Sequence, residues 1–144
     1  MRILVLNGPN LNLLGVREPG LYGTVDYDGL VALIQKECDA LGVEVRFYQS
    51  NHEGDLVDAI QAARLDCDGI VLNPGAYTHT SIAILDALKA VALPAAEVHI
   101  TDINQREEFR KVSYAGMACQ AHFIGQGLAG YLNAVRWLAE THSK

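Results

Sequence analysis

One stretch of the sequence combines a phenol and a guanidinium in a way that can serve proton transfer. Arg17 and Tyr22 lie in a glycine-punctuated segment, residues 15–23, which is long for a strand-to-helix loop of about 2–6 residues. A free tyrosine has a pKa of about 10, and a neighbouring cation favours its phenolate, so this pair can supply a base carried on a lid. The alternative is a surface turn in which Arg17 pairs with Glu18 and Tyr22 packs on the following helix.

A second candidate is a histidine at the end of an apolar run. Glu97 precedes His99 by two positions, so in a strand the two side chains share one face. An imidazole held by a carboxylate can act as a general acid or base. The alternative is a partly buried histidine that its neighbour merely satisfies. We assign no role to the other three histidines outside the motifs, His52, His122 and His142.

Two further side chains can hold an anion. His79 lies at the start of a predicted helix among hydroxyl residues, namely Thr78, Thr80 and Ser81. Those hydroxyls can cap the helix, or the helix start can bind an anion. Arg106 and Arg110 share a helical face with Glu107 and Glu108, which is typical of a solvated salt-bridge face. Arg110 is also close enough to the preceding strand to clamp a carboxylate.

The elements that position these residues alternate along the chain. Apolar runs predict strands at residues 3–7, 43–49, 69–73, 95–100 and 120–124. All but the second are apolar almost throughout, which indicates strands covered on both faces. Apolar stripes predict helices at residues 30–41, 56–63, 84–91 and 128–138, the first ended by Gly42 and the third by Pro94. Residues 103–110 are predicted to be a surface turn of helix.

This alternation predicts the α/β class, with a flavodoxin-like, doubly wound, five-stranded parallel sheet in a single domain that spans residues 1–144. By analogy with that fold we expect the strand order 2-1-3-4-5. Ligands of such sheets bind outside the carboxyl ends of the strands. Polar segments follow three of the strands, at residues 7–12, 73–81 and 97–101. We therefore expect them to converge on one edge and form the site.

Composition excludes several classes of function. The chain has 144 residues, of which 50% are hydrophobic and 19% charged, so it is not intrinsically disordered. A net charge of −6 disfavours binding to nucleic acid or to anionic lipid. No apolar run approaches the ~20 residues of a membrane span, and we expect a cytoplasmic protein. The three cysteines, Cys38, Cys67 and Cys119, form no CxxC, and no Walker A, GxGxxG, GxSxG or HExxH motif is present. We expect no metal and no cofactor.

The motifs as a whole resemble those of type II 3-dehydroquinate dehydratases. The resemblance begins with residues 7–15, NGPNLNLLG, and continues through Arg17-Glu18 and Tyr22-Gly23. It includes residues 73–81, NPGAYTHTS, residues 97–101, EVHIT, and residues 106–110, REEFR. Gly125-Gln126-Gly127 and Gly130-Tyr131 complete it, so essentially the whole chain is covered. Asp102 is a departure, because related sequences often have Asn there.

The resemblance implies dehydration of 3-dehydroquinate to 3-dehydroshikimate, in aromatic biosynthesis or quinate breakdown. It implies that Tyr22, as phenolate, removes a proton next to the ketone, and that Arg17 lowers the pKa of Tyr22. A water held by Asn10 would stabilise the enolate. His99, oriented by Glu97, would then protonate the departing hydroxyl. The ketone itself is the electron sink, so no cofactor or metal is implied.

The resemblance also implies how the substrate is held. The residues that would bind its hydroxyls and carboxylate are Asn73, Gly75, His79, Ile100, Thr101 and Arg110, the isoleucine and threonine partly through backbone N–H groups. The family forms homododecamers built from trimers, and an aspartate of the adjacent subunit, matched here by Asp86, reaches the site. Within one subunit, Asp86 is expected to be an exposed charge on a helix.

Two other functions share these features. A non-catalytic flavodoxin-like binding or signalling domain would have the same topology, but the phosphate loop and the acidic pair that such domains use are missing. A different lyase acting on a polyhydroxylated acid would need similar side chains, and only the resemblance argues against it.

Overall fold

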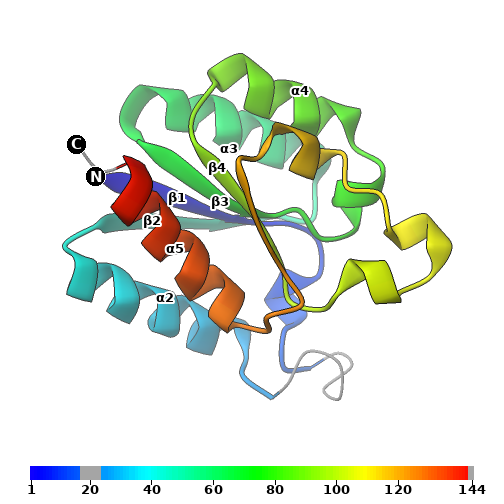
Figure 1. Cartoon of the computed structure of the whole chain (residues 1–144), viewed down its shortest axis with the longest axis horizontal. Helices are drawn as coiled ribbons and strands as arrows, with labels where there is room; N and C mark the ends of the chain where they lie inside the picture. The colour runs from blue at the N-terminus through cyan, green and yellow to red at the C-terminus, as the bar shows by residue number, and fades with distance from the viewer. Residues whose placement is uncertain (17–23, 143–144) are drawn as a thin grey trace.

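The protein, described by a computed structural model, is built around one five-stranded parallel sheet with helices on both faces (Figure 1). The structure describes residues 1–16 and 24–142. The strands are β1 (Arg2–Asn7), β2 (Glu44–Gln49), β3 (Gly69–Asn73), β4 (Ala95–His99) and β5 (Ala121–Ile124), in the order β2-β1-β3-β4-β5. The predicted fold class and strand order are confirmed, and the chain reverses its direction of winding between β1 and β3.

The helices form two layers, one on each face of the sheet. They are α2 (Tyr27–Leu41), α3 (Glu53–Asp66), α4 (Ile82–Val91) and α5 (Ala129–His142). Alternate residues of β1 face opposite layers: Ile3 and Val5 pack with the buried side chains of α2 and α5, and Leu4 and Leu6 with those of α3 and α4. Figure 1 shows the same division. Every residue of β1 after Arg2 is buried, because both sides of the strand lie in a core.

Not every strand is covered on both faces as predicted. β3 and β4 are buried along their whole length, whereas β5 is partly exposed, with His122 open to solvent. β5 is an edge of the sheet and pairs only with β4 in the structure as described. An apolar composition therefore indicated a buried strand correctly in the centre of the sheet and wrongly at its edge.

Helix ends follow local chemistry in two cases and differ from prediction in a third. Asp26 caps α2 by accepting a hydrogen bond from the backbone N–H of Gly29, and Gly42 ends the helix in the left-handed conformation. Ser81 caps α4 through the N–H of Ile84. α4 ends at Val91, the last residue predicted for it, but the residue that terminates it is Ala92, in the left-handed conformation with φ of 55°, and not Pro94. The left-handed conformation of Ala92 ends the helical hydrogen bonding two residues before Pro94.

The segment that follows β4 is also more complex than predicted. Residues 103–110 form two short 3₁₀ helices, η3 (Ile103–Gln105) and η4 (Glu108–Arg110), and not one turn of helix. Ile103 is buried and anchors the first of them. The described part of the chain contains no helix that is both long and apolar enough to cross a membrane.

Candidate active site

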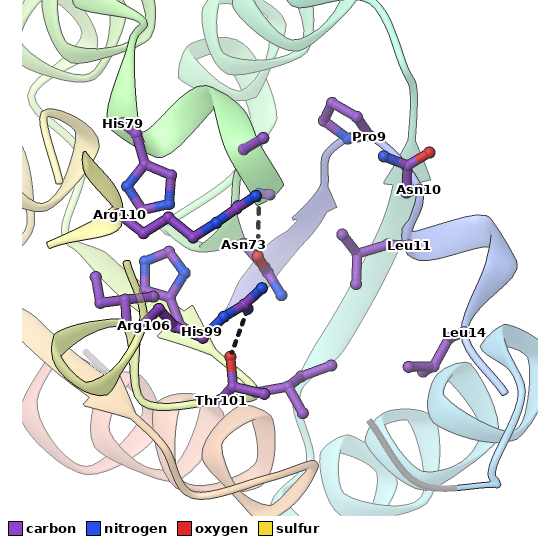
Figure 2. A pocket seen from close by; sticks show the side chains of 14 residues that line it. Pro9, Asn10, Leu11, Leu14, Asn73, His79, His99, Thr101, Arg106 and Arg110 are labelled. Atoms are coloured by element: carbon purple, nitrogen blue, oxygen red, sulfur yellow. Dashed lines mark hydrogen bonds between the residues drawn. The ribbon is translucent and has the colours of Figure 1, made fainter. Parts of the chain in front are cut away.

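A cavity of about 170 Å³ opens at the carboxyl ends of the strands, near the point between β1 and β3 where the chain reverses its direction of winding (Figure 2). It is lined by the loops after β1 and β3, by the end of β4 and by the segment that contains η3 and η4. It brings together most of the predicted site residues: Asn10, Asn73, Gly75, His79, His99, Ile100, Thr101 and Arg110. The three polar segments therefore converge as expected.

Two predicted site residues of the described chain, Glu97 and Asp86, do not line this cavity, and two others lie outside the described residues. Glu97 lies behind His99 with its side chain only 3% exposed. Asp86 is exposed on α4, as expected for a single subunit. Arg17 and Tyr22 fall in residues 17–23, outside the described residues, so their predicted roles stay predictions.

The end of β4 holds the predicted carboxylate and imidazole in contact. His99 Nε2 lies 2.8 Å from Glu97 Oε2, and both side chains are buried. Burial raises the pKa of Glu97, but hydrogen bonds from His99 and Ser113 outweigh it and lower that pKa to about 2. Glu97 is therefore an ionised acceptor near neutral pH, and Nε2 must be the donor. Only Nδ1 of His99 is left to exchange a proton with a ligand in the cavity.

Glu97 has two further partners that the sequence did not reveal. Ser113 donates a short hydrogen bond to Oε2. His122 Nδ1 lies 2.5 Å from Oε1. His122 is the register partner of Glu97 in the β4–β5 ladder. The fourth and fifth strands were expected to be neighbours, but the contact also depends on their register, which places Glu97 opposite His122 and is not given by the order of the strands.

The Ser113 hydroxyl is fully used in this arrangement. Because it donates to Glu97, the Thr78 hydroxyl, 2.6 Å away, must donate to it. The backbone N–H of Gly116 donates to the same oxygen at 3.1 Å. A Cβ placed on Gly116 would lie 2.5 Å from Glu97 Oε1. The carboxylate is therefore held in a socket that has no room for a side chain at this glycine.

The floor of the cavity is formed by Asn73 and Gly75 and is supported from below by buried neutral groups at the ends of β1 and β3. Asn7 and Asn73 are register partners at the ends of these strands. The Tyr131 hydroxyl donates to Asn7 Oδ1 at 2.6 Å and accepts from Asn73 Nδ2 at 2.8 Å. Asn73 Oδ1 accepts from the N–H of Gly75 at 3.1 Å. Tyr131 lies in the helical stripe predicted at residues 128–138 and in the motif Gly130-Tyr131, neither of which assigns a contact to its hydroxyl. That hydroxyl orients Asn73, which lines the cavity.

The loops after β1 and β3 pack closely against each other. A Cβ on Gly8 would meet the carbonyl oxygen of Pro74, and a Cβ on Gly75 would lie 3.0 Å from the carbonyl oxygen of Pro9. Gly75 also has a φ of 61°, which favours glycine. Each loop therefore places its glycine against the proline of the other.

Asn10 is held at the cavity by the loop that follows β2. Its backbone is left-handed, with φ of 70°, and its N–H donates to Asn51 Oδ1 at 3.0 Å. Gln49 Nε2 bonds to the same Asn51 oxygen and to the carbonyl of Gly8. Asparagine tolerates this backbone conformation better than most residues. Its side chain is thus presented by a fixed turn.

Two arginines and a histidine gather on the wall opposite Asn10, where Figure 2 shows Arg106, Arg110 and His79. His79 Nδ1 donates to the carbonyl oxygen of Val112 at 2.7 Å. Burial lowers the pKa of His79, and the neighbouring charges of His99, Arg110 and Arg106 lower it further. Ser81, one of the hydroxyl residues predicted as possible caps, caps α4.

The predicted ion pairing of the arginines is found for Arg110, whereas its role as a carboxylate clamp stays a prediction. Arg110 forms the expected ion pair with Glu107, 2.7 Å long, and it also lines the cavity. Arg106, predicted only for a solvated face, lines the cavity too and lies 3.4 Å from the hydroxyl of Thr101. With Glu97 set back behind His99, this wall suits a carboxylate ligand. Within residues 1–16 and 24–142, no cluster of three or more His, Cys, Asp or Glu side chains could hold a metal ion.

The fold and the cavity together define a class: an α/β enzyme in which a buried histidine, held by a carboxylate, faces a small polar cavity with two arginines on its wall. Comparison with known proteins narrows this class to one family. The family model described as dehydroquinase class II matches residues 1–139. The chain belongs to this family.

Named relatives agree with the match. A 3-dehydroquinate dehydratase of Lachnospira eligens is 50% identical over 146 residues, covering 100% of this chain and 99% of the relative. The crystal structure of type II dehydroquinase from Butyrivibrio crossotus superposes with a TM-score of 0.94 at 51% identity, covering 96% of this chain and 97% of that one. The type II dehydroquinase from Propionibacterium acnes gives a TM-score of 0.93 at 43% identity, with 96% of each chain covered. The predicted family is confirmed.

Proposed function

We propose that this chain is a lyase that dehydrates 3-dehydroquinate to 3-dehydroshikimate, a step of the shikimate pathway. The observation that carries the proposal is the Glu97–His99 pair at 2.8 Å, set at a cavity that has cationic side chains on one wall, in a chain of the dehydroquinase class II family. Relatives at about half identity over the whole chain carry the name of this activity. They do not favour a non-catalytic binding or signalling domain.

The reaction begins with removal of a proton from the carbon next to the ketone. Tyr22, as phenolate, takes this proton, and Arg17 favours the phenolate by its positive charge. The electron pair of the broken C–H bond moves into the enolate. A water held by Asn10 donates a hydrogen bond to the enolate oxygen. Support for the place of Asn10 comes from its fixed left-handed turn at the cavity.

The second half of the reaction expels the hydroxyl. His99 gives its Nδ1 proton to the departing oxygen while the C–O bond breaks, and the enolate electrons form the double bond conjugated with the restored ketone. The oxygen leaves as water. Tyr22 then holds one extra proton and His99 has lost one, so a proton must pass between them or through solvent before the next turnover. The Glu97 carboxylate stabilises the charged imidazole and fixes Nδ1 as the nitrogen that reacts.

Substrate binding uses the remaining lining residues. Arg110 and His79 supply positive and hydrogen-bonding groups for the carboxylate and hydroxyls, and Asn73 and Gly75 form the floor. Ile100 and Thr101 contribute backbone N–H groups at the end of β4. Closing of the Arg17–Tyr22 segment would expel water and strengthen these contacts. The ketone serves as the electron sink, and we assign no metal or cofactor to the reaction.

The assembly and location belong to the same proposal. We place Asp86 at the site of an adjacent subunit within a cytoplasmic homododecamer built from trimers. Its exposure on α4 is compatible with a contact to another subunit.

An ultraviolet assay of the purified protein tests the function directly, because the product is a conjugated enone that the substrate is not. We expect turnover that chelators do not reduce and that borohydride with substrate does not abolish. Tyr22→Phe and Arg17→Ala should keep the fold and lose most of kcat. Near-normal kcat in Tyr22→Phe would remove the base assignment, and a borohydride-trapped lysine adduct would point to imine chemistry.

A further inference from the structure

The Glu97 carboxylate has two oxygens, and they serve different partners. Oε2 accepts from His99 Nε2 at 2.8 Å and from Ser113. Oε1 is bonded to His122 Nδ1 at 2.5 Å, and no other side chain of the described residues is hydrogen-bonded to it. The Glu97 side chain is 3% exposed and that of His122 is 45% exposed. A histidine on the outer edge of the sheet therefore contacts the buried charge behind the cavity.

We propose that His122 is a positioning residue for the reaction, which fixes the Glu97 carboxylate through Oε1 and competes with His99 for its negative charge. This inference rests on the proposed role of His99 as the acid and extends it. His122 does not touch the cavity, since it is absent from the cavity lining. It acts only through the shared carboxylate.

The competition has a definite sign. A neutral His122 donates an N–H to Oε1, and a protonated His122 adds a full positive charge at the same place. Each draws negative charge away from the Oε2 side, so each weakens the hold of Glu97 on a protonated His99. Loss of the His122 side chain should therefore make protonated His99 more stable and make it a weaker acid.

Several other titratable or charged groups lie near Glu97 and His122, and their positions limit how much of the effect on His99 can be assigned to them. His79 ends the short 3₁₀ helix η2 (Gly75–His79) and lines the cavity. Arg106 and Arg110, in the segment after β4, also line the cavity and lie near His79. The Cys119 thiol, whose pKa burial raises to about 12, lies near Glu97 and stays neutral. Because none of these groups touches Oε1, a change confined to His122 isolates its contribution.

The sharpest test measures the titration of the His99 ring by NMR in the free protein, with His122 replaced in two ways. His122→Leu removes both the donor and the charge, and we expect the pKa of His99 to rise by about half a unit or more. His122→Asn keeps an N–H near the position of Nδ1 without a titratable charge, and should return most of the shift. His142→Leu, which removes a histidine that contacts only Trp137 among the described aromatic pairs, is the matched control and should leave His99 unchanged.

Kinetics give an independent readout. In His122→Leu we expect kcat to fall about threefold to tenfold with KM unchanged, and its high-pH limb to move upward with the His99 titration. His122→Asn should restore kcat. An unchanged His99 titration in folded His122→Leu would overturn the positioning role, even if stability were lower. Because the NMR titration needs no substrate, its outcome is separate from the outcome of the dehydratase assay.

Discussion

Two neighbouring regions of the same sheet edge hold the site by opposite means. The floor at β1 and β3 uses neutral groups, with the Tyr131 hydroxyl between the amides of Asn7 and Asn73. The wall at β4 and β5 uses a buried carboxylate with a histidine on each oxygen. Amides and a phenol fix geometry at every ordinary pH, since burial raises the pKa of Tyr131 above its usual range. A buried carboxylate makes the second region both stronger and sensitive to protons.

The largest difference between the regions should appear when the charge of the wall is removed. Glu97→Gln keeps the shape of the side chain and deletes the negative charge that stabilises protonated His99. We expect kcat to fall about 10²- to 10³-fold with a small change in KM, which is the usual scale of general-acid contributions. Steady-state kinetics on the folded variant measure this. A fall of less than about threefold would mean that the wall does not support an acid.

The next effect tests how tightly the wall is built. Gly116→Ala would place a Cβ 2.5 Å from Glu97 Oε1, so the carboxylate or η5 (Ala115–Ala118) must shift. We expect a loss of about 2–3 kcal/mol of stability, measured by urea unfolding, together with reduced kcat. Gly54→Ala is the matched control, because nothing lies within 4 Å of a Cβ there. Equal stability and equal kcat in the two variants would show that the surroundings of the Glu97 carboxylate accommodate the extra Cβ without loss of free energy.

A smaller effect is expected from the floor. Tyr131→Phe leaves the Asn73 amide and the Asn7 carbonyl without the hydroxyl that joins them, in a fully buried position. We expect about 1–2 kcal/mol of lost stability, and a moderate loss of kcat that does not vary with pH. Parallel pH–rate profiles of the wild type and Tyr131→Phe would support this contrast. A shifted profile would show that the floor and the wall are electrostatically coupled.

The last prediction concerns a loss of stability that is absent at neutral pH and grows only in acid. The folded-state pKa of Glu97 is lowered to about 2 from an ordinary value of 4.5. Its stabilising contribution is therefore complete above pH 4.5 and is lost as the pH falls toward 2. Urea unfolding of the wild type should show this decline, and Glu97→Gln should lack that part of it. Identical acid dependence in both proteins would contradict the assignment.

Prediction from sequence succeeded where the information lies within one segment or in the position of a segment at the end of a predicted strand. The Glu97–His99 contact follows from two residues on one face of one strand, and the cavity follows from polar segments at strand ends. His122 and Tyr131 were missed because their contacts depend on which residues of other elements lie opposite them. Periodicity placed Tyr131 correctly in the core, but it says nothing about where a hydroxyl at the end of the ring will lie. Edge position, which decides the exposure of β5, is likewise a property of the sheet and not of the strand.

Gly8 packs against Pro74, and Gly75 packs against Pro9. Because of these reciprocal contacts, a substitution in one of the two loops also affects the other, although they are far apart in the sequence. A bulkier residue in place of either glycine would displace the other stretch as well. Asn10 and His79, which these stretches carry, therefore cannot be repositioned independently of each other. Redesign for a larger ligand will therefore need matched substitutions in both loops. The effects of single substitutions on stability should be far from additive when they are combined.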